Sequence, residues 1–334
     1  MQAVVVGTGG WGTAISQILC DNGHETYLWS HNPAKAAEMA KTRENPLLKG
    51  VHLSEALRIT GDLDCLKGAD RVGSAPPSFA GRETAKKMAP YLTEKSVVVS
   101  VSKGIERDTN LRLSQVIGEE TGNLCPVVAL SGPSHAEEVG IRMPTGCVAA
   151  CRDADAARFA QDAFMNDYFR VYTSGDIVGV ELAGALKNVI ALSCGVCDGL
   201  GYQDNTKALL MTRAMAEITR LGEKLGGSRQ TFGGLAGMGD LIVTCTSMHS
   251  RNRRAGILIG QGKTPQEAMK EVGAVVEGYF AALSIHQLSQ RTGVEMPISR
   301  CAYEVLYEGK QVKNVVTELM TRAKKDELLE TVRP

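Results

Sequence analysis

The sequence predicts an α/β domain over residues 1–178, followed by an all-helical domain over residues 179–334. Short apolar runs typical of buried strands alternate with helical patterns up to residue 172, and no strand pattern recurs after it. The chain of 334 residues also exceeds what a single hydrophobic core usually organises. We therefore expect two domains with different secondary structure.

A glycine-rich turn near the N-terminus indicates what the first domain binds. Residues 2–6 (QAVVV) have the pattern of a buried strand, Gly7 to Gly12 (GTGGWG) form a turn, and residues 13–22 are helical. A G-x-G-x-x-G motif between a strand and a helix is typical of a Rossmann-like dinucleotide-binding domain. Gly7 allows the tight turn, Gly9 lets the backbone approach the pyrophosphate, and Gly12 lets the helix pack closely. The helix N-terminus then faces the phosphates. The alternative is a turn without a ligand.

The end of the second predicted strand, residues 26–30 (TYLWS), bears on the choice of cofactor. A site that prefers NAD usually has Asp or Glu there, bound to the ribose 2′-hydroxyl. This chain has Ser30, His31 and Asn32 instead. No carboxylate at these positions repels a 2′-phosphate and His31 can accept one, so we expect NADP to bind. The alternative for His31 is an ordinary exposed loop residue.

The remaining strands predict where ligands meet this domain. After a helical and then irregular stretch over 33–60, we expect strands over 71–77, 95–101, 126–130, 146–150 and 169–172, and helices over 81–92 and 153–165. The strand over 71–77 is the least typical, because Pro76 and Pro77 end it. Ligands lie beyond the carboxyl ends of such strands, where this chain has Lys103 and Ser134. We expect Ser134 to cap the next helix and leave N–H groups for an anion.

A long apolar helix from Val178 to Cys197 begins the second domain, and we expect Asp176 to cap it. Nearly all its positions suit a helix interior or a close helix contact, so the helix is predicted to be buried. Lys187 is the exception. A buried ammonium needs a carboxylate partner, an anionic ligand or a chemical task. Two interpretations stay open: a structural ion pair, with Glu181 or a distant acid, and a catalytic lysine.

The rest of the second domain is predicted to be helical over 206–225, 264–271, 278–291, 297–308 and 312–324. The glycine-rich segment 233–244 follows no strand, so we interpret it as a close approach of the chain that presents Asp240 rather than as a second nucleotide turn. The charged run 250–254 (SRNRR) is either a solvated face or a phosphate site at a helix start. In the second case Ser250, Arg251 and backbone N–H groups are the donors.

Composition excludes several classes of function. The formal net charge is zero, so nothing indicates a nucleic-acid surface or a polybasic membrane patch. We expect no signal peptide, because Val4 begins a strand-like run without a charged n-region or a cleavage site. We expect no stable membrane insertion, because the apolar helix carries Glu181, Lys187 and Asn188. The nine cysteines are scattered, and the lone C-x-x-C of Cys194 and Cys197 lacks the second pair that a zinc site needs. We expect reduced thiols, no metal, and a cytoplasmic protein.

A dinucleotide domain, a buried lysine and separate anion donors together suit hydride transfer to the carbonyl of a phosphorylated substrate. The lysine can supply the proton that the developing alkoxide needs. Two other functions remain as alternatives. One is a β-hydroxyacid-type dehydrogenase acting on another small substrate, and the other is a nucleotide-binding regulator without turnover.

From end to end the chain resembles the bacterial type of NAD(P)-dependent glycerol-3-phosphate dehydrogenase. The matching segments are GTGGWGTA at 7–14, SKGIE at 102–106, LSGPSHAEEV at 130–139, VELAGALKNVIA at 180–191, DGLGYQDNTKA at 198–208, GLAGMGDLIVTCT at 234–246, SRNRR at 250–254 and VVEGY at 275–279. The resemblance implies the reversible reduction of dihydroxyacetone phosphate to sn-glycerol 3-phosphate with NADP or NAD, which feeds phospholipid synthesis. We also expect a homodimer.

The resemblance further implies roles for individual residues. Lys187 is implied to be the catalytic proton donor or acceptor. The implied substrate contacts are Lys103, Gly132, Ser134, Asp240, Ser250, Arg251 and Asn252. Together with the turn glycines Gly7, Gly9 and Gly12, the cofactor contacts are Gly10, Trp11, His31, Lys103, Ala136, Arg251, Val275 and Glu277. Three places depart from the family pattern. SAPPS at 74–78 replaces an apolar strand ending in Val-Pro-Ser, which bears on a cofactor-loop contact at Ser78. The other two are Gly10 in place of Ser and His135 in place of Phe.

Overall fold

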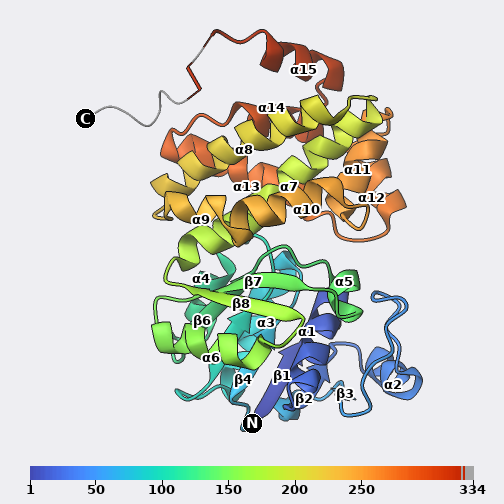
Figure 1. Ribbon diagram of the computed structural model, residues 1–334, viewed down its shortest axis with the longest axis vertical. Helices are drawn as coiled ribbons and strands as arrows, with labels where there is room; N and C mark the ends of the chain where they lie inside the picture. Colours follow the sequence, from blue (N-terminus) through green and yellow to red (C-terminus); the bar gives the residue numbers. More distant parts are fainter. Residues whose placement is uncertain (325, 328–334) are drawn as a thin grey trace.

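The computed structural model describes residues 1–324, 326 and 327, and it has two parts stacked along the long axis of the molecule (Figure 1). One part is a sheet with helices on its faces, and the other consists of helices. All eight strands precede residue 175, and only helices follow in the described residues. The predicted fold class is therefore confirmed. The predicted domain boundary after residue 178 lies in the first turn of α7 (Ile177–Gly199), and residue 334 lies outside the described residues.

One sheet contains every strand, in the order β3-β2-β1-β4-β5-β6-β7-β8. The strands are β1 Gln2–Val6, β2 Glu25–Trp29, β3 Arg58–Thr60, β4 Arg71–Ser74, β5 Val97–Ser100, β6 Val127–Ser131, β7 Thr145–Ala150 and β8 Phe169–Ser174. Neighbours run parallel except β6 and β7. The chain order reverses between β1 and β4, and sheets of this kind bind ligands beyond the strand ends at such a reversal.

Two strands differ from the sequence-based expectation. β4 is a fully buried central strand, but it ends at Ser74 rather than at residue 77, because Pro76 and Pro77 cannot donate to a ladder. The short strand β3 falls in the stretch expected to be irregular, so that expectation is wrong there. β3 has only three residues and pairs only with β2 among the described strands, which explains why it lacks an alternating apolar pattern.

Helices pack on both faces of the sheet (Figure 1). They are α1 Gly10–Asp21, α2 Pro33–Thr42, α3 Gly81–Met88, α4 Leu113–Glu120, α5 Ala136–Gly140 and α6 Ala154–Phe164. The helix expected over 81–92 changes to a 3₁₀ turn at Ala89–Tyr91, since Pro90 lacks the N–H that an α-helix needs. Ser134 does not cap α5: the capping position is His135, whose side chain makes no capping bond. That prediction was wrong, because Ser134 instead donates to the main-chain oxygen of Gly132.

The helical part is built around α7, which begins near the sheet and runs diagonally among the other helices (Figure 1). The others are α8 Asp204–Lys224, α9 Arg229–Gly233, a π-helical turn Leu235–Gly239, α10 Asp240–Thr246, α11 Arg251–Gly260, α12 Pro265–Val272, α13 Glu277–Thr292, α14 Pro297–Tyr307 and α15 Val312–Met320. The last helix ends four residues before the predicted residue 324, where the chain becomes exposed. Asp176 caps α7 as predicted, by accepting from the Gly179 N–H.

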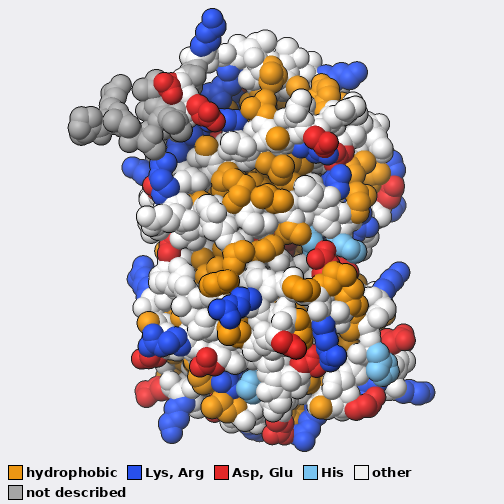
Figure 2. Space-filling model, viewed as in Figure 1, with side chains coloured by type: hydrophobic (Ala, Val, Ile, Leu, Met, Phe, Trp, Pro, Cys, Tyr) orange, Lys and Arg blue, Asp and Glu red, His pale blue; other side chains and the backbone are white. Residues whose placement is uncertain are grey.

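α7 is long and apolar enough to cross a membrane, but 83% of its most apolar window is buried inside the protein. Its packing is close because glycines on two helices face each other. A Cβ atom on Gly195 would lie 2.0 Å from the main-chain oxygen of Arg253, and one on Gly256 would lie 2.0 Å from that of Leu192. The backbones of α7 and α11 are therefore in direct contact, as expected for a core helix. The outer surface is indented where the two parts meet, with hydrophobic side chains on both sides (Figure 2).

Candidate active site

The glycine turn has the geometry of a phosphate-binding turn. Gly7 has a φ of 125°, and a Cβ atom there would lie 2.9 Å from the Ala75 main-chain oxygen. A Cβ on Gly12 would lie 2.1 Å from the Gly7 oxygen, so only glycine allows α1 to pack this closely on the turn. Open space surrounds the Cβ position of Gly9. The three glycines thus have the three properties that dinucleotide binding requires, and α1 begins at Gly10, so that Gly12 lies in its first turn.

Other predicted cofactor residues lie around this turn. The Trp11 indole N–H donates to the main-chain oxygen of Val101 at 3.1 Å, which ties α1 to the end of β5. Ala136, the first residue of α5, lies beside Gly10, whose Cβ would be 3.7 Å from that of Ala136. The same Cβ would lie 2.6 Å from the Leu47 main-chain oxygen, so the family's usual Ser does not fit here without a shift. The absence of a side chain at Gly10 therefore fits the close approach of the Leu47 main chain in this protein.

Lys103, Lys187 and Asp240 meet at the junction of the two parts. Lys187 Nζ donates to Asp240 Oδ1 at 2.6 Å, and Lys103 Nζ donates to Asp240 Oδ2 at 2.7 Å and to the Gly132 oxygen at 2.8 Å. The side chains of Asp240 and Lys187 are 1% and 5% exposed, whereas that of Lys103 is 20% exposed. The carboxylate is therefore clamped between two ammonium groups, of which Lys103 lies nearer to solvent.

The environment shifts the pKa values of this cluster. Burial lowers the pKa of Lys187 to about 8, opposed by the Asp240 charge and assisted by that of Lys103. Burial alone pushes the pKa of Asp240 upward, but the two lysines outweigh it and hold this pKa below the usual value. Asp240 is therefore ionised at neutral pH, and Lys187 titrates much closer to neutral pH than an ordinary lysine does.

Lys187 does not pair with Glu181, the nearer of the two partners considered from the sequence. The Glu181 carboxylate accepts from Arg112 at 2.5 Å and from the Ser114 N–H at 2.8 Å. The partner is the distant acid, Asp240, 53 residues along the chain. An ion pair therefore exists, but it lies beside Lys103 and Gly132, two of the predicted substrate contacts.

Thr244 is a member of the cluster that the sequence did not indicate. Its Oγ1 accepts from Lys187 Nζ at 2.5 Å and donates to the Asp240 main-chain oxygen at 2.6 Å. Asp240 and Thr244 are one turn apart on α10, so both face α7. The i, i+4 spacing of Asp240 and Thr244 is the feature of the sequence that could have indicated Thr244 as a member of the cluster. Together they fix the direction of the Lys187 amine.

The N-terminus of α11 carries the predicted phosphate residues. Ser250 is buried and caps the helix by accepting from the Arg253 N–H at 3.2 Å. Arg251 is exposed and makes no hydrogen bond or ion pair within the described part of the chain. Asn252 is buried: its Oδ1 accepts from the Gly278 N–H at 2.8 Å, and its Nδ2 donates to Asn188 Oδ1 at 2.9 Å. The Asn252 side chain thus links α11 to α13 and to the residue next to Lys187.

Glu277 and Ser78 join the two parts of the molecule. Glu277 is the first residue of α13, and its carboxylate accepts from the Ser78 N–H at 3.2 Å and from the Ser78 hydroxyl at 2.7 Å. Ser78 follows β4 at the edge of the glycine turn. The predicted cofactor contact Glu277 is therefore held by the SAPPS segment, and Val275 lies half-buried two residues before it. His31 lies exposed after β2, with no hydrogen bond to any of these residues in the described ranges.

Comparisons with known proteins agree with this geometry. Residues 2–157 match the family model "NAD-dependent glycerol-3-phosphate dehydrogenase N-terminus", and residues 176–317 match the model of the C-terminus. The chain belongs to this dehydrogenase family.

Among its relatives, glycerol-3-phosphate dehydrogenase [NAD(P)+] of Bacillus velezensis is 48% identical over 99% of this chain and 97% of its own. The enzyme of the same name from Clostridium perfringens is 50% identical over 96% of this chain and 98% of its own. The crystal structure of glycerol-3-phosphate dehydrogenase from Coxiella burnetii superposes with a TM-score of 0.92 at 34% identity, over 96% of this chain and 99% of that one.

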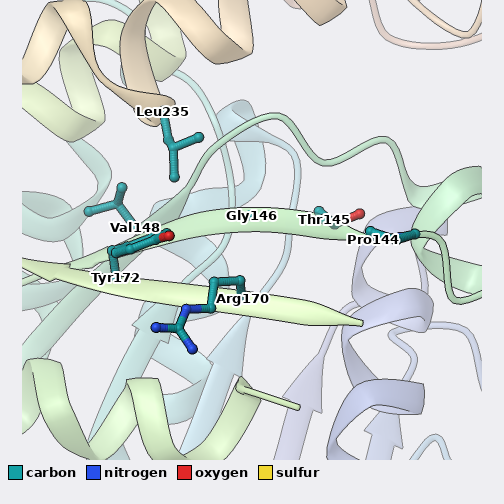
Figure 3. Close-up of a pocket in the computed structure, with 7 residues that line it drawn as sticks. All are labelled: Pro144, Thr145, Gly146, Val148, Arg170, Tyr172 and Leu235. Carbon is teal, nitrogen blue, oxygen red and sulfur yellow. The ribbon is translucent and has the colours of Figure 1, made fainter. Parts of the chain in front are cut away.

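A hollow in this glycerol-3-phosphate dehydrogenase family member lies on β7 and β8. It is open, has a volume of about 560 Å³ and is lined by Pro144, Thr145, Gly146, Val148, Arg170, Tyr172 and Leu235. Figure 3 shows Leu235 pointing from the helical part toward the strands. Arg170 is the only charged residue in its lining, so this hollow lacks the groups that dehydrogenase chemistry needs.

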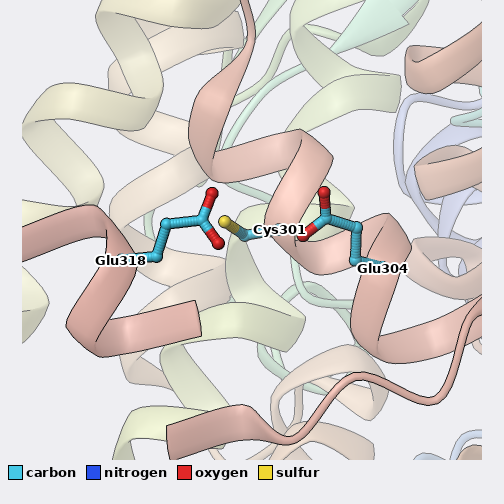
Figure 4. A group of neighbouring side chains, drawn as sticks. All are labelled: Cys301, Glu304 and Glu318. Atoms are coloured by element: carbon cyan, nitrogen blue, oxygen red, sulfur yellow. The ribbon is translucent and has the colours of Figure 1, made fainter. Parts of the chain in front are cut away.

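One group of possible metal ligands is present in the described residues. Cys301, Glu304 and Glu318 lie close together on α14 and α15 (Figure 4). Lys310 Nζ donates to Glu304 at 2.7 Å and to Glu318 at 2.5 Å, and Arg300 donates to Glu318 at 2.7 Å. Cations of the chain itself therefore neutralise both carboxylates, and this group gives no support for a metal site.

Proposed function

We propose that the chain catalyses the NAD(P)H-dependent reduction of dihydroxyacetone phosphate to sn-glycerol 3-phosphate, and its reverse, with Lys187 as proton donor and acceptor. The buried Lys187 ammonium, held by Asp240 and Thr244 where the dinucleotide part meets the helical part, carries the proposal. Family membership and the names of the relatives support the substrate.

The bound nicotinamide cofactor supplies or accepts the hydride. In reduction, Lys187 gives a proton to the substrate oxygen, and in oxidation it takes that proton back. Asp240 Oδ1 and Thr244 Oγ1 each accept a short hydrogen bond from it, and the Asp240 main-chain oxygen accepts only at 3.5 Å, so this third N–H is the one proposed to reach the substrate. A pKa of about 8 suits both directions near neutral pH. Lys103 adds a second positive charge beside the developing alkoxide.

The N-terminus of α11 is the proposed site of the substrate phosphate. The Ser250 hydroxyl and the exposed Arg251 guanidinium are available donors, and the helix terminus adds N–H groups and a favourable dipole. Asn252 contributes through its backbone N–H, because its side chain already bridges Asn188 and Gly278. Gly132 and Ser134 lie beside Lys103, at the end of β6.

The test compares dihydroxyacetone phosphate with dihydroxyacetone, by following NADPH absorbance. Two charge-assisted hydrogen bonds to phosphate, each worth roughly 1.5–3 kcal/mol, predict a kcat/KM at least about 100-fold higher for the phosphorylated ketone. Equal rates favour the alternative dehydrogenase without a phosphate site. Absence of turnover with both ketones favours the non-catalytic regulator.

We also propose that NADPH is used at least as readily as NADH, because Ser30 and His31 stand where an NAD site has an acid. A preference for NADH of more than about tenfold in kcat/KM, or roughly 1.4 kcal/mol, contradicts this.

The protein is further proposed to be a cytoplasmic homodimer that supplies phospholipid synthesis. All nine cysteines are free thiols, which agrees with a reducing compartment. The helical part exposes large apolar side chains, Leu209 on α8 and Ile242 on α10, at 49% and 48%. Light scattering on the purified protein tests the dimer, and a monomer at micromolar concentration contradicts it.

A further inference from the structure

Lys35 is a cation that the roles described above leave unused. It lies in the first turn of α2, and its Nζ donates to the main-chain oxygen of Thr8 at 3.0 Å. Thr8 is the second residue of the glycine turn. No carboxylate in residues 1–324, 326 or 327 lies within ion-pair distance of Lys35. An ammonium has three N–H groups, so two of them have no acceptor in the described structure.

The loop between β2 and α2 holds Lys35 beside the glycine turn. The Ser30 hydroxyl accepts from Thr8 Oγ1 at 3.1 Å and from the Asn32 N–H at 3.3 Å. The Asn32 side chain then caps α2 by accepting from the Lys35 N–H at 3.1 Å. Asn45 Nδ2 also donates to the Thr8 oxygen, at 3.2 Å. Lys35 is thus attached to a well-bonded loop at the carboxyl end of β2, where Rossmann folds bind the adenosine ribose.

We infer that Lys35 binds the 2′-phosphate of NADP(H) and is the residue that sets the preference for this cofactor. The inference rests on the proposed position of the cofactor along the glycine turn. Positive charge gathers there from two sources, the Lys35 ammonium and the N-terminus of α2, since the helix dipole is positive at that end. The position is also where an acid excludes NADP in an NAD-specific site.

The half-buried setting of Lys35 agrees with this role. Burial lowers the pKa of Lys35, and no carboxylate interaction counters the shift. A phosphate dianion next to the ammonium compensates for the lost hydration by charge-assisted hydrogen bonds. His31, exposed in the same loop, is free to contact the outer side of the phosphate.

A structural role predicts a different result. If Lys35 only fastens α2 to the glycine turn, its loss loosens the whole adenosine site and weakens ligands with and without a 2′-phosphate alike. If Lys35 binds the 2′-phosphate, the loss is selective. Two nucleotide fragments separate these cases: 2′,5′-ADP carries the 2′-phosphate, and AMP lacks it.

The experiment measures the dissociation constants of both fragments by isothermal titration calorimetry, for the wild type and the variants Lys35→Ala, Lys35→Arg and Lys41→Ala. Lys41 lies exposed in the last turn of α2, so its variant changes the net charge equally without touching the loop. Lys35→Ala is expected to weaken 2′,5′-ADP by about tenfold or more and AMP by less than about twofold. Lys35→Arg is expected to restore most of the affinity, and Lys41→Ala to change neither constant.

Three results overturn the inference: equal weakening of both fragments in Lys35→Ala, unchanged binding of 2′,5′-ADP in that variant, or a wild type that binds the two fragments equally. Turnover of dihydroxyacetone phosphate by the wild type with NADH tests the proposed reaction separately. The proposed dehydrogenase function and the proposed role of Lys35 are therefore tested by two different measurements, and either can fail without the other.

Discussion

Replacing Lys187 by Met tests the proposed chemistry most directly, because it removes the amine and keeps an unbranched apolar side chain. In the wild type, Asp240 lies between Lys187 on Oδ1 and Lys103 on Oδ2, at 2.6 and 2.7 Å. The variant therefore does not leave the carboxylate unpaired, since Lys103 remains. The charge of the cluster falls from +1 to 0. The free energy of unfolding is expected to stay within about 2 kcal/mol of the wild type, because replacing a buried charge by an apolar group is often neutral.

The expected effect on turnover is much larger than the effect on stability. Loss of a general acid lowers kcat by about 10²–10⁴-fold, or roughly 3–5 kcal/mol. Asp240→Asn is the informative contrast, because it removes the carboxylate that separates the buried Lys187 ammonium from the partly exposed Lys103 ammonium. That variant is expected to lose about 3–5 kcal/mol of stability.

The assay normalises kcat to folded protein. NADPH oxidation with saturating dihydroxyacetone phosphate gives the rate, thermal unfolding followed by circular dichroism gives the folded fraction, and quenching of intrinsic fluorescence gives the affinity for NADPH. Wild-type turnover per folded molecule in Lys187→Met refutes the assignment of Lys187 as proton donor. A loss of stability in Lys187→Met as large as in Asp240→Asn, with normal turnover, assigns Lys187 to a structural ion pair.

Three further outcomes are expected. Reduction needs protonated Lys187, whose pKa is about 8, so kcat for reduction is expected to be constant below pH 8 and to fall above it. The kcat for oxidation is expected to rise through pH 8, and pH–rate profiles from pH 6 to 10 check both signs. Arg251→Ala is expected to raise KM for dihydroxyacetone phosphate about tenfold, which is the lower end for a charged hydrogen bond at an exposed group. Arg254→Ala is the control and is expected to leave KM unchanged. A KM for Arg251→Ala equal to that of the wild type indicates that the charged run is only a solvated face. Ser78→Ala removes the 2.7 Å hydroxyl bond to Glu277 and is expected to weaken NADPH binding about tenfold in a fluorescence titration, and an unchanged dissociation constant contradicts a cofactor role for Glu277.

Features set by neighbouring residues are predictable from the sequence. The glycine turn follows from steric limits at Gly7 and Gly12, and the burial of α7 follows from its lack of a polar face. Asp176 caps α7 through a bond to Gly179, three residues away. The edge strand β3 is not predictable in this way, because a three-residue strand is defined by its partner β2 rather than by its own pattern.

Contacts between distant segments decide the rest of the site. The sequence shows that Lys187 needs a partner, but Glu181 and Asp240 are equally acceptable until the fold places Arg112 on Glu181. The bond between Ser78 and Glu277 spans 199 residues. A local pattern carries no information about such pairs, since any exposed loop is free to contain Ser or Glu. Resemblance to a family supplies the residues, and the fold supplies the partners.

The spacing between the proposed proton donor and the proposed phosphate site follows from one helix contact. Gly195 and Gly199 on α7 face Gly256 and Gly260 on α11, and in each case an added Cβ would lie within 2.4 Å of a main-chain oxygen of the other helix. Because no side chain separates the two backbones, α11 cannot slide or tilt without a steric clash. The Asn252–Asn188 bond then fixes the register at the N-terminus of α11, beside Lys187. In the proposed reaction, a substrate that reaches from the α11 terminus to Lys187 therefore meets a gap of fixed length.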